Sequence, residues 1–276
     1  MPNEIYKLSE DREHAKKHWN TIPCGTGGYL DAYTEGSREY FDAIRDMRYS
    51  SESWMNDGID WNIAKNKRLL EVGHGVGTDL VRFAQAGAIV HGVDISQTHH
   101  DMTKQNLACH GLSGELKFSD ATNIDFPDEY FDVVYSHGVL HHLEETKDAI
   151  EEIRRVLKPG GTFLMSVYHK YSGFHLIGKI LMNGIRNKQL LTLGYAGMMS
   201  TIESGADGIT TRPLVKTFSK GQVRKMLRGF ESVDLSVHHF SVSHFSSDLF
   251  ARLVSPEMEP KLEPWLGWYV VSRAIK

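Results

Sequence analysis

The sequence has few cysteines, no excess of positive charge and no long hydrophobic run. Its 276 residues include only Cys24 and Cys109, too few for a framework of disulfides, which indicates a reducing compartment. Lys and Arg total 31 against 35 Asp and Glu, so no cationic surplus is present to bind nucleic acid. The N-terminal residues lack the features of a signal peptide, and no apolar stretch is long enough to span a membrane. We therefore expect a cytoplasmic protein without nucleic-acid partners or stable membrane insertion.

What the sequence does contain is a glycine-rich turn between a buried strand and a helix. Residues 69–79 read LLEVGHGVGTD, with glycines at Gly73, Gly75 and Gly77, and a second apolar strand ends at Asp94. Glycines allow a ligand to lie against the backbone, and an acid at the tip of the next strand can accept both hydroxyls of a ribose. The pattern predicts a nucleoside-binding crevice at the carboxyl ends of parallel strands.

The spacing of the glycines distinguishes between classes of nucleoside. A dinucleotide-binding turn has a glycine at the position that Thr78 occupies here. Asp79, in the first turn of the following helix, would repel a phosphate although it suits the positive end of the helix dipole. An NAD(P)-dependent oxidoreductase is therefore the less favoured alternative.

Further motifs follow in a fixed order. Residues 130–136 are a β-branched and aromatic run that is typical of a buried central strand. The sequence GVLHHL occupies 138–143, and a helix with an apolar period close to 3.6 follows over 149–157. The sequence KPGG at 158–161 has the composition of a helix end, and 162–167 reads as another strand.

Together, the pieces from Leu69 to Val167 closely resemble the methyltransferase type 11 group of class I S-adenosylmethionine (SAM) methyltransferases. The resemblance implies an α/β fold with a Rossmann-like seven-stranded sheet, mostly parallel with an antiparallel last strand, and helices on both faces. It also implies a SAM-dependent enzyme that methylates a small-molecule acceptor, with oxygen or nitrogen as the expected acceptor atom. A protein that keeps the SAM fold without turnover remains the other alternative.

The resemblance also implies a set of cofactor-binding residues. Asp94 would accept the ribose hydroxyls, Ile95 would pack on the adenine, and Asp120 would receive the adenine amino group. His74 departs from the small or Cys residue that many relatives have, and it either bonds the carboxylate of SAM or fills space. The full implied set is Glu71, Gly73, His74, Gly75, Gly77, Asp94, Ile95, Asp120, Ala121, Ser136 and His137.

Three histidines are candidate general bases because of their places in this fold. His137 and His141 follow the fourth strand, whose carboxyl end faces the transferred methyl group, and His169 lies at the end of the fifth. An imidazole titrates near neutral pH, so each of them can accept a proton from an acceptor in the cell.

The 15 histidines show no recognised metal-ligand spacing, so we predict no metal. The alternative is that His137, His141 and Glu144 converge on one loop. Adjacent pairs such as His141-His142 cannot both face one point from a regular helix or strand. His99, His100 and His110 are expected on the solvated face of a helix.

The flanking regions are expected to shape the acceptor pocket. Residues 1–67 are predicted to form a helical cap over a methyltransferase domain at 68–276. Four aromatic residues of the cap either face substrate or fix it to the core, namely Trp19, Tyr29, Tyr33 and Tyr49. An insertion at about 168–215 is longer than an ordinary crossover, which indicates a lid.

The apolar residues of the insertion also allow a second interpretation. Leu176, Ile177, Ile180 and Leu181 form an apolar face beside two cations, so a homodimer interface or a membrane contact is the alternative to a lid. Ser219 is predicted to cap a helix, and two final strands are expected at 230–240 and 266–274.

Overall fold

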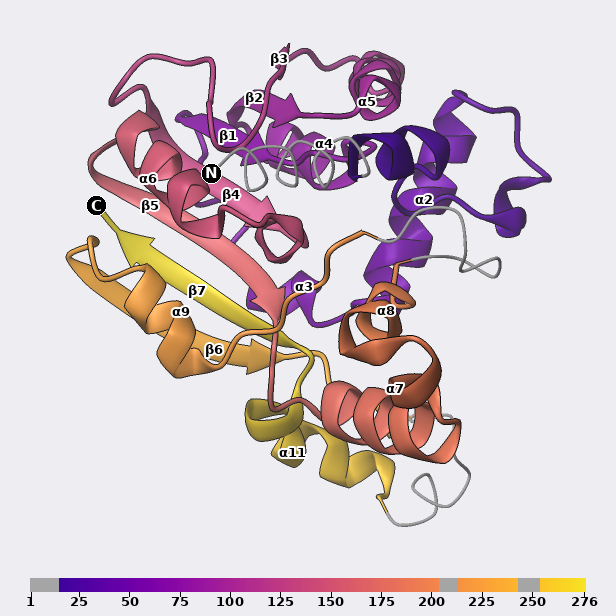
Figure 1. Cartoon of the computed structure of the whole chain (residues 1–276). Helices are drawn as coiled ribbons and strands as arrows, with labels where there is room; N and C mark the ends of the chain where they lie inside the picture. The colour runs from indigo at the N-terminus through magenta and orange to yellow at the C-terminus, as the bar shows by residue number, and fades with distance from the viewer. Residues whose placement is uncertain (1–14, 204–212, 243–253) are drawn as a thin grey trace, which may run out of the picture.

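The computed structural model describes residues 15–203, 213–242 and 254–276. Their centre is a seven-stranded sheet with the order β3-β2-β1-β4-β5-β7-β6. Neighbours from β3 to β5 pair in parallel, whereas β7 is antiparallel to both β5 and β6. This confirms the predicted class I methyltransferase sheet with its antiparallel last strand (Figure 1). The strands are β1 Arg68–Val72, β2 Ile89–Asp94, β3 Glu115–Phe118, β4 Phe131–His137, β5 Leu157–Tyr168, β6 Ser232–His238 and β7 Tyr269–Ile275.

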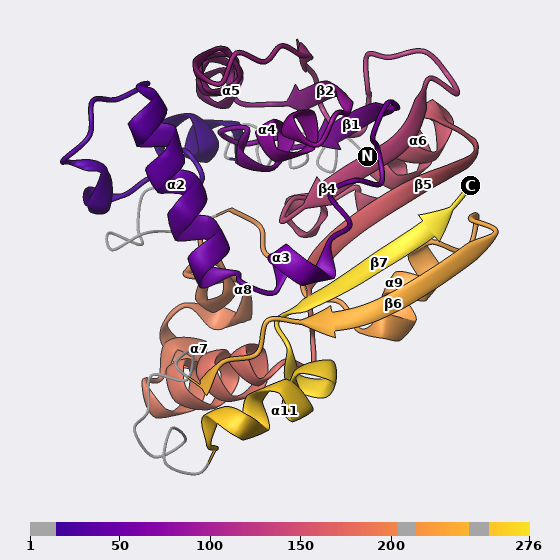
Figure 2. The ribbon, with the colours of Figure 1, turned by 180° about the vertical axis from the view of Figure 1, so that it is seen from behind.

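Helices lie on both faces of the sheet. Helices α6 and α9 cover one face, and α3 and α4 lie on the other, as Figures 1 and 2 show from opposite sides. The helices are η1 Gly28–Leu30, α2 Arg38–Ser51, α3 Met55–Gly58, α4 Thr78–Gln85, α5 Gln97–Cys109, η2 Leu140–His142, α6 Thr146–Val156, η3 Phe174–Arg186, α7 Gln189–Thr192, α8 Gly194–Ser200, α9 Lys220–Met226, η5 Pro256–Met258 and α11 Glu259–Leu266.

The sequence explains where the elements of the C-terminal half begin and which faces they bury. Helix α6 buries Ala149, Ile150 and Ile153, the apolar positions of its predicted period. Helix α9 begins at a capping box in which Ser219 and Gln222 exchange hydrogen bonds, as the predicted cap requires. Beyond α9, β6 and β7 are the two predicted final strands.

Strand β4 separates the two main hydrophobic clusters because its side chains alternate between the faces. Val134 belongs to the cluster under α6, together with Phe163 of β5 and Val270 of β7. Tyr135 belongs to the cluster on the opposite face, with Phe83 of α4. The sheet is therefore packed on both sides and holds the carboxyl ends of its parallel strands in place.

Two further regions lie at those carboxyl ends. Helix α2 stands beside the ends of β1 and β4, and η3, α7 and α8 form a separate group after β5 (Figure 1). Residues Leu176 and Leu181 of η3 are exposed, whereas Ile180 packs with Tyr168 and Trp268. Among the described residues, no helix has both the length and the apolar character needed to cross a bilayer.

Candidate active site

A cavity of about 360 Å³ opens at the carboxyl ends of the parallel strands. This volume lies within the range of small-molecule sites. One end is formed by residues that follow β1, β2 and β3, and the other by α2, β4, β5, β7 and the insertion. Six of the predicted cofactor residues line it: Gly73, Gly75, Asp94, Ile95, Ala121 and His137.

The glycine turn adopts a backbone that side chains would obstruct. Gly73, Gly75 and Gly77 have φ values of 75°, 54° and 80°, in the left-handed region that favours glycine. A Cβ on Gly73 would stand 2.3 Å from Cγ2 of Val139, and one on Gly77 would stand 2.7 Å from Cγ2 of Thr103. Glycine is therefore required both by the conformation and by the close approach of neighbouring side chains.

Asp94 is held at the cavity wall by donors on three sides. Its carboxylate accepts hydrogen bonds from the backbone N–H of Gly75 at 3.1 Å and of Ser96 at 2.8 Å. His99 accepts from the N–H of Cys24 at Nε2, so its Nδ1 carries the proton and donates to Asp94 at 3.2 Å. Burial alone would raise the pKa of Asp94, but these bonds hold that pKa below its ordinary value. Asp94 is thus an oriented anion.

Two predicted cofactor residues face away from the cavity. His74 bonds Thr103 through Nδ1 at 3.0 Å and packs so closely on Gly92 that a Cβ there would meet its ring at 2.6 Å. His74 is not among the residues that line the cavity. Glu71 is buried, and burial with Asp79 nearby raises the pKa of its carboxyl well above the ordinary range.

The remaining predicted cofactor residues lie behind the cavity wall. Asp120 accepts hydrogen bonds from the backbone and the hydroxyl of Thr122, both at 2.8 Å. Ser136 donates to the carbonyl of Val72 at 3.1 Å. Gly77 is not among the residues that line the cavity either.

The prediction that His99, His100 and His110 lie on a solvated surface is wrong. His99 and His100 are 4% and 8% exposed, and the side chain of His110 is 4% exposed. The cause is the N-terminal region: Asn20 accepts from the hydroxyl of Ser96, the cap of α5, and Asp42 of α2 bonds His110 at 3.2 Å. The cap therefore covers this polar helix.

At the inner end of the cavity, His137 meets a buried carboxylate. Nε2 of His137 lies 3.1 Å from Oε2 of Glu52, and the hydroxyl of Tyr269 donates to Oε1 at 2.9 Å. Burial by itself would raise the pKa of Glu52, but His137 and its hydrogen bond hold it well below the ordinary value. Because the ionised carboxylate only accepts, Nε2 carries the proton and Nδ1 of His137 has the lone pair.

A second polar cluster lies beside the first. The hydroxyl of Tyr168 donates to Glu203 at 2.7 Å, and both residues line the cavity with His142. The ring of His141 stacks on Tyr168 at 3.7 Å and is fully buried, and burial lowers its pKa well below the ordinary value.

The three predicted general bases thus differ in position. His137 lines the cavity, whereas His141 lies behind Tyr168 and His169 bonds the carbonyl of Gly267 at 3.1 Å. The alternative metal set does not come together, because Glu144 is exposed and His137 is paired with Glu52. Of the four cap aromatics, Trp19 and Tyr29 line the cavity; Tyr33 and Tyr49 do not.

The N-terminal cap is also hydrogen-bonded to the residue that follows the glycine turn. Arg48 of α2 donates to Asp79 through Nε at 3.1 Å and Nη2 at 2.8 Å. Tyr49 and Tyr135 donate to the same carboxylate at 2.8 and 2.9 Å. Asp79 lies in the first turn of α4, just after the glycine turn. Three of these hydrogen bonds tie the cofactor end of the cavity to α2, and the fourth ties it to β4.

Comparison with known proteins agrees with this site. The family model described as "Methyltransferase domain" matches residues 70–165. Among curated relatives, sterol 4-C-methyltransferase strm-1 of Caenorhabditis elegans is 31% identical over 105 residues, which is 37% of this chain and 31% of the relative. Ubiquinone/menaquinone biosynthesis C-methyltransferase UbiE of Proteus mirabilis is 28% identical over 151 residues, 47% of this chain and 59% of the relative.

Residues 70–165 match a methyltransferase domain, and the sheet that contains them has the class I methyltransferase fold. This match supports SAM as the cofactor over a dinucleotide. A SAM-dependent methyltransferase structure from Thermotoga maritima, titled a possible histamine N-methyltransferase, superposes with a TM-score of 0.54 at 18% identity, over 86% of this chain and 93% of that one. This likeness supports the fold. The chain spans less than two thirds of the length of the two curated relatives.

Sequence reasoning missed the residues at the inner end of the methyltransferase cavity. Glu52 directly follows α2, and Glu203 lies within the insertion shortly after α8. Both are outside the recognisable motifs. Tyr269 belongs to a predicted strand and Tyr168 begins the predicted insertion, but nothing in the sequence pattern marks either as a cavity residue. The signal that could have found Tyr168 is its place at the carboxyl end of β5, beside β4.

Proposed function

We propose that this protein transfers the methyl group of SAM to a small-molecule acceptor bound at the inner end of the cavity. The observation that carries the proposal is that one cavity joins Gly73 and Asp94, at the cofactor end, to Glu52 and His137 at the other. Bound SAM supplies an electrophilic methyl group, so the protein has to orient the acceptor and accept any proton that it loses.

The cofactor end suits the nucleoside and methionine parts of SAM. Gly73 and Gly75 leave the backbone open, and Asp94 offers an oriented carboxylate to the ribose hydroxyls. Ile95 and Ala121 supply apolar contacts where the resemblance places the adenine. The ring of His74 packs against Gly92 and is not among the residues that line the cavity.

His137 is the proposed general base. Glu52 fixes its orientation and its proton at Nε2, and Tyr269 fixes Glu52 in turn. The lone pair is then at Nδ1, which is buried and has no hydrogen-bond partner among the described residues, so the ring has to shift slightly to present it to an acceptor. This is the arrangement by which a carboxylate orients a catalytic imidazole, here with the roles of the two nitrogens exchanged. His141 and His169 do not line the cavity, so they are less suited to the role.

The acceptor is proposed to carry a dissociable proton and a largely apolar or aromatic body. Trp19, Tyr168 and Tyr269 provide aromatic walls, and the polar groups are few. Oxygen or nitrogen is the predicted acceptor atom, while both curated relatives are named C-methyltransferases, so an activated carbon is the alternative. A general base at His137 could remove the proton from an oxygen, a nitrogen or an activated carbon acceptor.

The flanking regions fit the same proposal. The cap contributes Trp19, Arg48 and Glu52 to the cavity, and the insertion contributes Glu203, as a cap and a lid would. A cytoplasmic location remains a prediction from the cysteine content, and Cys24 and Cys109 are free thiols. The homodimer also remains a prediction.

Calorimetric titration with S-adenosylhomocysteine tests the cofactor end, and release of labelled methyl groups to a fractionated metabolite pool tests turnover. Asp94→Asn should weaken binding about 10- to 100-fold, because charged hydrogen bonds to the ribose are lost. Asp101→Asn removes an exposed charge on α5 and should leave affinity unchanged. Equal affinities for the two variants would show that the crevice is misassigned, and binding without turnover would favour the non-catalytic alternative.

A further inference from the structure

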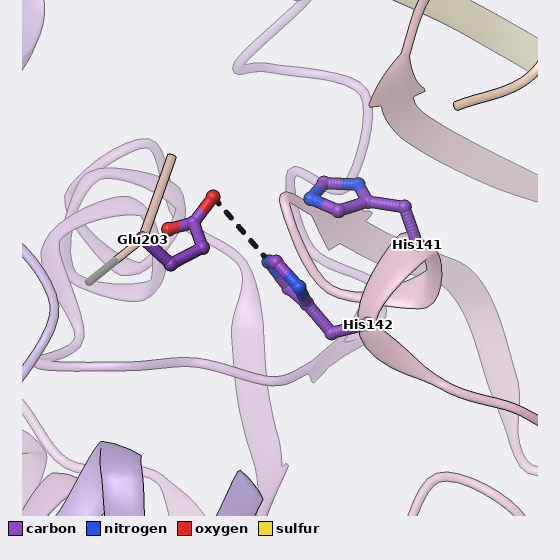
Figure 3. Close-up of side chains that lie close together, drawn as sticks. All are labelled: His141, His142 and Glu203. Carbon is purple, nitrogen blue, oxygen red and sulfur yellow. Dashed lines mark ion pairs between the residues drawn. The ribbon is translucent and has the colours of Figure 1, made fainter. Parts of the chain in front are cut away.

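Two adjacent histidines and a distant carboxylate converge beside the proposed acceptor site. His141 and His142 belong to the short helix η2, and Glu203 comes from the insertion. One nitrogen or oxygen atom of each lies within 4.8 Å of the other two. Figure 3 shows the three side chains gathered together, with Glu203 directed toward the ring of His142. Adjacent residues cannot do this from a regular α-helix or strand, but the 3-10 turn brings the two imidazole rings to 4.2 Å. The expectation for adjacent histidines in a regular helix or strand therefore does not apply to this pair.

His142 presents a lone pair to the carboxylate. Its Nδ1 lies 2.7 Å from the carbonyl oxygen of Leu214, which only accepts, so Nδ1 carries the proton. Its Nε2 then has a lone pair and lies 3.8 Å from Oε1 of Glu203. A lone pair that faces a carboxylate is repelled unless a positive group stands between them. The partner for this pair is therefore a proton or a metal cation.

His141 favours the metal. It is fully buried, and neither of its ring nitrogens has a hydrogen-bond partner within the described residues. Leaving such a group without a partner costs about 1–3 kcal/mol. A proton on Nε2 of His142 would give that residue and Glu203 a favourable ion pair. It would still leave both ring nitrogens of His141 without a hydrogen-bond partner. A metal ion would engage all three, and a buried imidazole is most stable in the uncharged form that binds metals.

Tyr168 supplies the outer contacts of the cluster. Its hydroxyl donates to Oε1 of Glu203 at 2.7 Å, which orients the carboxylate, and its ring stacks on His141 at 3.7 Å. The carbonyl oxygen of Leu214 orients the ring of His142 by accepting a hydrogen bond from its Nδ1. Such second contacts, which fix the tautomer and direction of each ligand, are the usual surroundings of a protein metal site.

We propose that His141, His142 and Glu203 bind a divalent first-row transition metal, with Zn²⁺ as the reference ion. Two imidazoles and one carboxylate are a ligand set of zinc enzymes and of mononuclear Fe(II) sites. Ligand atoms at about 2.1 Å from zinc stand about 3.4 Å apart, so the most widely separated pair of ligand atoms has to close by up to about 1.4 Å. His142 and Glu203 line the cavity, so a remaining coordination position would be open to water or to the acceptor.

The test uses the full chain after removal of metal with a chelator. Calorimetric titration with Zn²⁺ alone should give one site per chain, and Co²⁺ should give the visible absorption of a four-coordinate site. Glu203→Gln and His142→Gln should each weaken Zn²⁺ binding at least tenfold. Tyr168→Phe keeps the stacked ring but removes the hydroxyl, and it should weaken binding about tenfold.

Glu52→Gln is the matched control. It removes a second carboxylate of the same cavity, bonded to a different histidine, and should leave Zn²⁺ affinity unchanged. No stoichiometric binding by the wild type up to 100-fold molar excess of Zn²⁺ would overturn the proposal, as would equal affinities for wild type and Glu203→Gln. The readout needs neither SAM nor turnover, so failure here is distinct from failure of the proposed methyl transfer. His141→Phe can be added, but the three other variants suffice if it does not fold.

Discussion

Glu52 and His137 are 85 residues apart in the sequence, and their side chains meet at 3.1 Å in the wall of the cavity. The contact joins the end of α2, in the N-terminal cap, to the carboxyl end of β4. It gives the cap a role beyond covering the cofactor crevice, because the orientation of the proposed general base depends on it. The proposed base and the carboxylate that orients it thus come from separate parts of the chain.

Glu52→Gln should lower turnover of the acceptor found by the metabolite screen about 100-fold, because the amide no longer enforces the proton at Nε2 of His137. Affinity for S-adenosylhomocysteine should not change, since Glu52 lies at the other end of the cavity from Asp94. Tyr269→Phe should have a smaller effect in the same direction, because it removes one hydrogen bond to Glu52 and keeps the ring. Steady-state kinetics with calorimetry on each variant measure both quantities. Unchanged turnover in Glu52→Gln would exclude His137 as an oriented base.

The motifs near the sheet were predictable because each residue's role is local. Gly73 and Asp94 are next to the strands that place them, and a strand's end in this fold is a fixed location. Ser219 could be assigned as a helix cap for the same reason. Prediction was weaker where contacts depend on distant segments. Glu203 is followed by no recognisable motif, and only the folded insertion brings it to His142.

The histidines of α5 show the same limit. Their spacing and polarity are those of an exposed helix face, yet His99 is buried because the cap lies over α5. A single sequence does not show that a polar face will be covered by another polar segment. The error has a consequence for function, since His99 turns out to orient Asp94.

The depressed pKa of Glu52 makes stability depend on pH below the ordinary titration range of a glutamate. The unfolded carboxyl takes up a proton near pH 4.5, whereas the folded one stays ionised to lower pH. The unfolded state therefore binds more protons in this window, and stability falls as pH decreases, by up to about 1.4 kcal/mol per pH unit for this one group. Above pH 4.5 the contribution is fully present.

Urea unfolding of wild type and Glu52→Gln at pH 6, 5, 4 and 3 measures this effect. The difference in free energy of unfolding between the two proteins should be constant from pH 6 to 5 and then shrink as the pH falls. Parallel curves down to pH 3 would mean that Glu52 titrates alike in the folded and unfolded states, which contradicts its pairing with His137.

Arg48→Met should destabilise the fold by about 3 kcal/mol, because it leaves the buried carboxylate of Asp79 without its cation. The side chain of Asp79 is 3% exposed, and the two tyrosine hydroxyls that remain cannot neutralise it. Arg45→Met is the matched control: Arg45 lies one turn earlier on α2 and pairs with Asp42 and Asp46 at the surface. Its loss should cost less than about 1 kcal/mol. Urea unfolding at pH 7 compares them, and a similar cost for both would mean that the pair with Asp79 does not hold the cap.

Gly73→Ala should abolish measurable binding of S-adenosylhomocysteine, because the new methyl group has no room. It would stand 2.3 Å from Cγ2 and 2.8 Å from Cγ1 of Val139, so the turn or the loop after β4 has to move into the cavity that both line. Gly111→Ala separates this clash from backbone strain. Gly111 has a φ of 69°, close to the 75° of Gly73, but a Cβ there meets no atom within 4 Å. Both variants should lose similar stability from strain, of order 1 kcal/mol, and only Gly73→Ala should lose the ligand. Calorimetric titration of both variants measures the affinity for S-adenosylhomocysteine, and thermal unfolding measures their stability. Retained affinity in Gly73→Ala would place the cofactor elsewhere than against this turn.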